Sequence, residues 1–194
     1  MDGKYSIDEI IKLTGGELLQ KGVENLFVNH LLIDSRRVFS ANDSIFIAVN
    51  GDRHDGHDFV LEAFQRGVRS FIVQKNVTLD LIPGTWVLKV PDTLIALQTI
   101  AEKHRTCFKY PIIAITGSNG KTIVKEWLHQ LLKDEIHIVR SPKSYNSQVG
   151  VPLSLWQMDT SHEMGIFEAG VSKVGEMGAL ERMIKPDLGI ITNL

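Results

Sequence analysis

Short apolar runs alternate along the chain with stretches in which apolar residues recur every three or four positions. Runs of the first kind are typical of buried strands, and the second spacing is typical of helices with one buried face. The runs predicted to form strands are 30–33, 44–49, 70–73, 85–90, 112–115, 136–139, 165–168 and 188–192. Because strands that alternate with helices favour parallel sheets, the pattern predicts an α/β fold.

Polar residues and glycines mark the ends of the predicted helices. Ser6 followed by Glu9 predicts a capping box before a short helix that ends near Gly15. A second helix covers 59–64, and a third is predicted after the Pro91-Asp92 pair, because proline and aspartate are common where a helix begins.

The predicted elements fall into two groups, which we interpret as domains 1–90 and 91–194. The second group opens with a buried strand, a glycine-bearing turn and a helix, the order typical of doubly wound, mostly parallel sheets. The helix is predicted to bury a face made of Val124, Trp127, Leu128, Leu131 and Leu132. The chain ends at an apolar strand, and parallel strands are normally covered on both faces, so we expect this domain to be truncated.

Composition narrows the class of protein. The 194 residues are 43% apolar with a mean hydropathy of zero, as in ordinary soluble globular proteins. A formal charge of −2, with both signs well mixed, makes nucleic acid an improbable partner. The single Cys107 excludes an intramolecular disulfide, and no apolar run approaches the ~18 residues of a membrane span. We therefore expect a cytoplasmic protein, and a monomer.

A glycine-bearing segment between a predicted strand and a predicted helix indicates a phosphate-binding loop. Its residues are Thr116, Gly117, Ser118, Asn119, Gly120, Lys121 and Thr122. The glycines let the backbone approach phosphate oxygens, Lys121 can reach the β- and γ-phosphates of a nucleotide, and Thr122 can place its hydroxyl on Mg²⁺. Ile115 stands where the strict motif has glycine, and a surface turn with a solvated Lys121 is the alternative.

The segment 115–122, followed by Val124-Lys125-Glu126, resembles the ATP-binding segment of the Mur ligases, which also lacks the first glycine. Further blocks at 33–36, 51–59 and 145–154 occur in the same order as in that family. The segment 167–170, with 175–177 and 185–187, resembles the member that adds D-alanyl-D-alanine. Ile123 and Ser147 depart from the usual family residues, and neither is a proposed metal or phosphate ligand.

The resemblance implies that the first domain binds the UDP-muramoyl end of a peptidoglycan precursor. The residues implied in this binding are Ser35, Arg36, Asp52, Arg53, His54 and His57. An arginine can hold a diphosphate with two hydrogen bonds, although an isolated loop arginine is more often solvated. The two histidines with their neighbouring aspartates also suggest a metal site, and we favour a polar turn that contacts substrate.

Two further residues complete the predicted chemistry. Glu168 ends a predicted strand at the carboxyl edge of the sheet, where ligands bind in open α/β folds. The resemblance makes it a Mg²⁺ ligand together with Thr122, and makes Lys121, Asn146 and Glu168 the catalytic set. Without the resemblance, Glu168 is an ordinary strand-end residue and Asn146 a routine loop residue.

The implied reaction is that of an ATP-dependent amide ligase. ATP phosphorylates the terminal carboxylate of UDP-N-acetylmuramoyl-tripeptide, and the amine of D-alanyl-D-alanine attacks the acyl phosphate. The family's metal-binding histidine, carbamylated lysine, adenine contacts and carboxy-terminal domain lie beyond residue 194, so we expect no ligase turnover from this chain. The alternatives are another P-loop ligase or kinase, such as the folylpolyglutamate synthase type, and a non-catalytic UDP-sugar binding module. Some bacteria carry this type of ligase fused to an alanine racemase, and the 194 residues leave that arrangement open.

Overall fold

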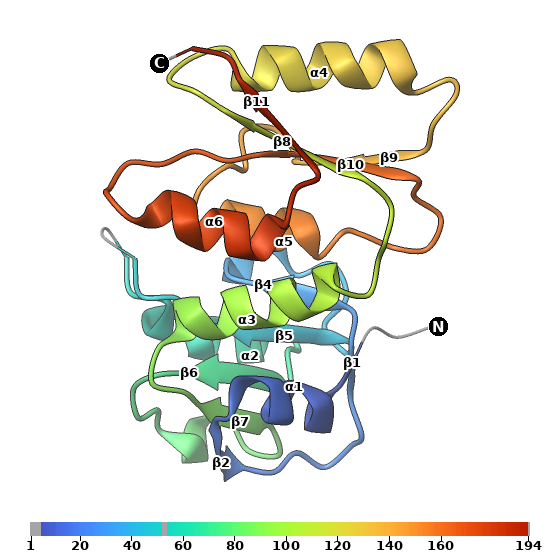
Figure 1. Cartoon of the computed structure of the whole chain (residues 1–194). Helices are drawn as coiled ribbons and strands as arrows, with labels where there is room; N and C mark the ends of the chain where they lie inside the picture. The colour runs from blue at the N-terminus through green and yellow to red at the C-terminus, as the bar shows by residue number, and fades with distance from the viewer. Residues whose placement is uncertain (1–4, 52–53, 194) are drawn as a thin grey trace. The chain divides into compact units, whose positions relative to one another are not determined.

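The computed structural model describes residues 5–51 and 54–193 and separates into two compact units, 1–97 and 98–194. The division falls within α3 (Thr93–Arg105), whereas the boundary predicted near Val90 follows the last strand of the first unit. In the described part of the chain, no helix has the length and apolar character needed to cross a membrane. Each unit is built on its own sheet (Figure 1).

The sheet of the first unit is parallel except at one edge. In sheet order its strands are β2 (Glu17–Gln20), β7 (Trp86–Lys89), β6 (Ser70–Val73), β5 (Ser44–Ile47) and β4 (His30–Leu32), and only β2 runs antiparallel to its neighbour. The other elements are β1 (Tyr5–Ser6), α1 (Ile7–Thr14), β3 (Phe27–Val28), η1 (Ser35–Arg37), η2 (Gly56–Phe59), α2 (Val60–Gln65) and η3 (Leu79–Leu81). This arrangement agrees with the predicted small α/β domain.

Burial explains why the central strands read as continuous apolar runs. Every residue of β5 and β6 is buried, as expected for strands covered on both faces. Phe46 and Phe71 lie opposite each other in the parallel register and pack edge to face, 6.3 Å between ring centroids. The only hydroxyls on these strands are Ser44 and Ser70, and Ser70 Oγ donates to the Ser44 carbonyl at 2.8 Å.

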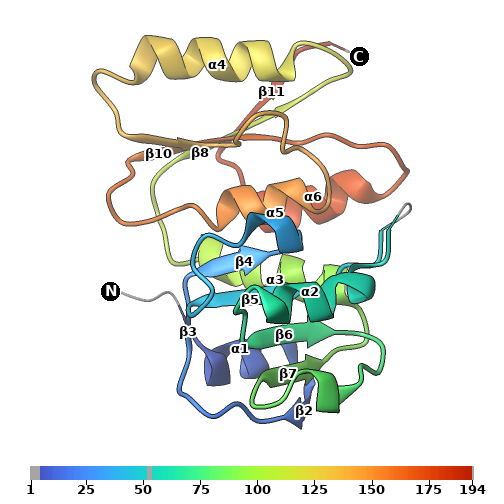
Figure 2. The same cartoon turned by 180° about the vertical axis from the view of Figure 1, so that it is seen from behind.

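The second unit is a fully parallel sheet with helices on both faces. In sheet order its strands are β11 (Leu188–Ile191), β8 (Ile112–Thr116), β10 (Met164–Glu168) and β9 (Ile138–Arg140). Helix α4 (Lys121–Leu132) covers one face, and α5 (Gly150–Leu155) with α6 (Glu176–Ile184) covers the other (Figures 1 and 2). The predicted doubly wound, P-loop type of domain is confirmed.

The prediction of the buried face of α4 is correct for three of its five residues and wrong for the other two. Val124, Leu128 and Leu132 pack against the isoleucines of the sheet, but Trp127 and Leu131 are 64% and 77% exposed. A helix lying on a sheet buries a narrow stripe of residues four apart, and no described residue covers the adjacent stripe. Helices α5 and α6 and the antiparallel strand β2 were not predicted, because Pro152, glycines and polar residues interrupt their apolar patterns.

The capping box at the start of α1 is present as predicted. Ser6 Oγ accepts a hydrogen bond from the Glu9 backbone N–H at 3.3 Å, and Glu9 Oε2 accepts one from the Ser6 N–H at 2.8 Å. These bonds satisfy donors that a helix otherwise leaves free at its first turn. Gly15, with φ of 64°, ends the helix in the left-handed conformation that glycine adopts without strain.

Replacing Ser6 by alanine is expected to lower the free energy of unfolding by about 1 kcal/mol, because the Glu9 N–H loses its acceptor. Urea denaturation followed by circular dichroism measures the change. Glu9→Gln is the matched control, since glutamine can still accept from the Ser6 N–H and should cost less. Unchanged stability in Ser6→Ala would show that this cap does not stabilise the fold.

Candidate functional site

The phosphate-type loop lies between β8 and α4, at the carboxyl edge of the second sheet. Gly117 and Gly120 have φ of 130° and 83°, a region of backbone space that other residues rarely adopt. A Cβ on Gly117 would also lie 2.8 Å from the carbonyl oxygen of Asn193. The loop delivers the chain to Lys121 at the start of α4, where free backbone N–H groups and the helix dipole favour an anion.

Two residues after β11 brace this loop. Asn193 Oδ1 accepts hydrogen bonds from Ser118 Oγ at 2.9 Å and from the Asn119 backbone N–H at 2.8 Å. Thr192 Oγ1 donates to the Thr116 carbonyl at 3.1 Å. Neither residue has a predicted role, although the pairing of β11 with β8 brings the carboxyl ends of these two strands together.

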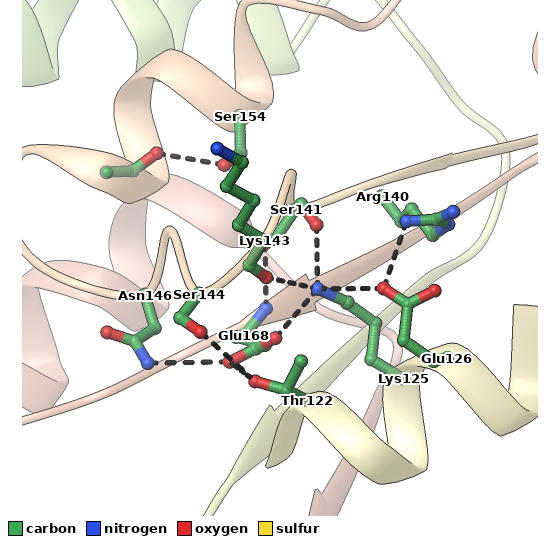
Figure 3. Close-up of polar contacts among 11 residues, drawn as sticks. Thr122, Lys125, Glu126, Arg140, Ser141, Lys143, Ser144, Asn146, Ser154 and Glu168 are labelled. Atoms are coloured by element: carbon green, nitrogen blue, oxygen red, sulfur yellow. Dashed lines mark hydrogen bonds and ion pairs between the residues drawn. The ribbon is translucent and has the colours of Figure 1, made fainter.

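Thr122, which was predicted as a Mg²⁺ ligand, lies beside the loop with Asn146 and Glu168, two residues of the predicted catalytic set (Figure 3). Thr122 Oγ1 lies 3.1 Å from Glu168 Oε2, and Asn146 Nδ2 lies 3.4 Å from the same oxygen. Two neighbouring ligands of an octahedral Mg²⁺, each about 2.1 Å from the ion, are roughly 3 Å apart. The oxygen pair of Thr122 and Glu168 therefore fits Mg²⁺ in both chemistry and spacing.

Lys121 lines a pocket of about 220 Å³. Its Nζ donates to the Gly117 carbonyl at 2.6 Å, so the ammonium lies over its own loop. The pocket is lined by Lys121, Asn146, Ser147, Gln148, Gly170, Val171, Ser172 and Glu176. The structure thus brings together Lys121 and Asn146, two residues that the sequence analysis joined only through a resemblance.

Glu176 also lines that pocket. Its Oε2 accepts hydrogen bonds from the Ser172 N–H at 2.6 Å and the Lys173 N–H at 2.9 Å. These backbone donors lower the pKa of the Glu176 carboxyl below its usual range. The carboxylate thereby fixes the loop that follows β10, a role that the sequence did not predict, although Glu176 lies in the segment 175–177 of the family resemblance.

The role of Lys125 was not predicted from the sequence. Its side chain is fully buried, and its Nζ lies 2.8 Å from Glu168 Oε1, 2.8 Å from the Ser141 carbonyl and 3.3 Å from Glu126 Oε1 (Figure 3). It also donates to the Lys143 carbonyl. The residue was noted only as part of a family motif, because helical periodicity places a lysine in solvent by default.

In the first unit, a pocket of about 360 Å³ collects three of the predicted substrate-binding residues. It is lined by Ile33, Asp34, Ser35, Arg36, His54 and Phe59. Two hydrogen bonds of 2.9 Å from the Arg36 guanidinium to the two Asp34 oxygens hold the arginine, and they lower the pKa of Asp34. The Arg36 side chain remains 78% exposed, so its guanidinium is oriented and also accessible.

His57 is used inside the fold. Its Nδ1 lies 2.6 Å from Asp55 Oδ1, and its Nε2 accepts from the backbone N–H groups of Gln74 at 3.0 Å and Lys75 at 3.2 Å. Bonds from the Lys75 ammonium and the His57 N–H lower the pKa of Asp55. With both ring nitrogens engaged, His57 braces the turn and lies outside the pocket that holds His54.

The remaining predicted substrate residues, Asp52 and Arg53, lie outside the described residues. Over 5–51 and 54–193, no cluster of three or more His, Cys, Asp or Glu side chains has the arrangement of a metal site. The candidate metal site beside the phosphate loop differs from such a cluster because its oxygen donors are one hydroxyl and one carboxylate.

Comparison with known proteins identifies related sequences. Residues 115–194 match the family model of the Mur ligase middle domain. A curated UDP-N-acetylmuramoyl-tripeptide--D-alanyl-D-alanine ligase of Bacillus subtilis is 31% identical over 191 residues, which cover 98% of this chain and 41% of the relative. A ligase of the same name from Treponema pallidum is 37% identical over 171 residues, covering 83% of this chain and 36% of the relative. The chain thus spans about two fifths of these relatives.

Solved structures give the same result. A crystal structure of MurF from Acinetobacter baumannii superposes with a TM-score of 0.84 at 27% identity, covering 95% of this chain and 40% of that one. MurF ligase from Thermotoga maritima in complex with ADP gives a TM-score of 0.73 at 28% identity, covering 84% of this chain and 37% of that one. On the combined agreement of loop, fold and sequence, the chain belongs to the Mur ligase family.

Proposed function

We propose that the chain supplies the precursor-binding and ATP-binding parts of an ATP-dependent ligase that adds D-alanyl-D-alanine to UDP-N-acetylmuramoyl-tripeptide. The observation that carries the proposal is the meeting of Lys121, Thr122 and Glu168 at one end of a parallel sheet. The names of the curated relatives support the choice of substrates, and a MurF structure in complex with ADP supports nucleotide binding.

The proposed chemistry joins two anions. The terminal carboxylate of the tripeptide attacks the γ-phosphorus of ATP, so that a C–O–P bond forms and ADP leaves. The amine of D-alanyl-D-alanine then attacks the acyl carbon, phosphate leaves, and the nitrogen loses a proton. Lys121 and the N–H groups at the start of α4 would offset the repulsion between carboxylate and ATP.

Mg²⁺ would be held by the Thr122 hydroxyl and the Glu168 carboxylate, and it would neutralise charge on the transferring phosphoryl group. Asn146 would orient the phosphate or the carboxylate through its amide, which faces both Glu168 and the Lys121 pocket. In the first unit, Ser35, Arg36 and His54 would bind the UDP end of the precursor. Because the reaction consumes ATP and a UDP-linked precursor, we assign it to the cytoplasm.

Gly117→Ala is expected to weaken ATP binding at least about tenfold, because a Cβ would strain the loop and meet Asn193. Calorimetric titration with Mg²⁺ and ATP measures the loss. Gly189→Ala is the matched control, because a Cβ there meets nothing within 4 Å and φ is ordinary. Equal affinity in the wild-type chain and Gly117→Ala would argue against nucleotide binding on this loop.

The wild-type chain is expected to bind UDP-N-acetylmuramoyl-tripeptide more tightly than UDP, and Arg36→Ala is expected to lose about tenfold, as for one bidentate charged contact. Titration calorimetry measures both affinities. Arg66→Ala is the matched control, because the Arg66 side chain is 47% exposed and is likewise paired with a carboxylate, but it does not line the pocket. If a folded wild-type chain prefers neither ligand, the assignment of the first unit is wrong.

The isolated chain is expected to show no ADP-forming ligation, because its relatives are more than twice as long. A coupled ADP assay with UDP-N-acetylmuramoyl-tripeptide and D-alanyl-D-alanine tests this expectation. ADP that appears only when both substrates are present, together with the ligated product by mass spectrometry, would contradict it. ATP binding without turnover would agree with a partial enzyme.

A further inference from the structure

Lys125 is an unusual residue to bury. It lies on α4 one helical turn after Lys121, and its side chain has no exposed surface. Removing an ammonium from water is costly unless charges and hydrogen bonds compensate it. The position therefore needs a reason that apolar packing against the sheet does not provide.

The contacts of Lys125 supply that reason, because they join three separate segments. From α4, its Nζ reaches the Glu168 carboxylate on β10 and the carbonyls of Ser141 and Lys143 in the loop after β9. The same loop continues to Asn146, one of the residues facing the candidate site. The Lys125 ammonium thus connects α4, the candidate metal ligand Glu168 and the loop 141–146.

The two oxygens of the Glu168 carboxylate face different partners. Oε1 lies against Lys125, while Oε2 faces Thr122 at 3.1 Å and Asn146 at 3.4 Å. Glu168 is itself fully buried, and its backbone N–H donates to Ser141 Oγ at 3.0 Å. The ion pair therefore selects the orientation in which Oε2 alone is turned to the site.

Lys125 does not itself reach a ligand. An ammonium has three N–H donors, and four oxygens already surround this one: Glu168 Oε1, Glu126 Oε1 and the carbonyls of Ser141 and Lys143. Lys143 holds its carbonyl toward Lys125 with φ of 51°, which is uncommon for a residue with a side chain. The backbone of this loop thus adopts an uncommon conformation at the residue whose carbonyl accepts from Lys125.

Resting on the proposed function, we infer that Lys125 is a positioning residue: it holds Glu168 and the 141–146 loop in the geometry that binds Mg²⁺ and ATP. Lys121 neutralises phosphate directly, and Lys125 fixes the groups around it. Loss of Lys125 removes the ammonium that pairs with Oε1 and releases the carbonyls of Ser141 and Lys143.

The first test needs no nucleotide. In Lys125→Met, amide hydrogen exchange of 141–146 is expected to rise at least tenfold, including the Tyr145 N–H that donates to the Pro142 carbonyl at 3.1 Å. Lys133→Met, an exposed lysine at the end of the same helix, is the matched control. A uniform rise across the second unit, or none, would overturn the inference in favour of a lysine that serves stability alone.

The second test separates metal from nucleotide. The affinity for ATP is measured by calorimetry, once with EDTA and once with Mg²⁺. In Lys125→Met, the affinity without metal is expected to stay within about twofold of wild type. The factor by which Mg²⁺ increases the affinity is expected to fall at least tenfold. Equal losses in both titrations would contradict a positioning role. If the wild-type chain binds ATP in neither condition, the proposed function is refuted. The hydrogen-exchange experiment would still test whether Lys125 holds the 141–146 loop in place.

If Lys125→Met fails to fold, the pair of variants Glu168→Gln and Glu168→Gln/Lys125→Met decides the matter, because the double variant leaves no unpaired buried charge. A lysine that acts through Glu168 predicts that the double variant loses no more of the Mg²⁺-dependent gain than Glu168→Gln alone. Additive losses would mean that the two residues act independently, and would overturn the inference.

Discussion

The parallel pairing of β8 with β10 is the constraint on which the second unit depends. Its register sets Glu168 opposite Ile115, so the carboxylate lies beside the last residues of the strand that leads into the phosphate loop. Parallel strands end at the same edge of a sheet, and β11, paired on the other side of β8, delivers Asn193 to that edge as well. A shift by one residue would turn Glu168 to the opposite face.

Burying Glu168 at that edge creates an electrostatic problem that the surrounding residues resolve. An unpaired charge in a protein interior is strongly destabilising, and removing one partner of a buried ion pair costs roughly 3–5 kcal/mol. Lys125 compensates Oε1, and Thr122 and Asn146 donate toward Oε2. The arrangement keeps a carboxylate in a dry, fixed position, where its charge acts more strongly on a cation than it would in water.

The two units differ in how much of their sites the sequence could predict. In the first unit some contacts of the predicted residues are local: Asp34 bonds Arg36 two residues away, and Asp55 bonds His57 at the same spacing, although His57 also accepts from the Gln74 N–H. Such pairs stand out in the printed sequence. In the second unit, Thr122 meets Glu168 across 46 residues and Ser118 meets Asn193 across 75. Periodicity predicted the strands and the loop between them, but only strand order determines which ends become neighbours.

Helix α4 shows why residue type alone does not reveal a role. Lys121 and Lys125 are one turn apart on the same helix, yet the first lines a pocket and the second is fully buried. The difference arises from what faces each position: a glycine carbonyl and a pocket for Lys121, and a carboxylate with two carbonyls for Lys125. The apolar pattern made the opposite error at Trp127, assigning it to the core although it is exposed. In both cases the error comes from reading burial off hydropathy, whereas burial is set by the segments that pack against the helix.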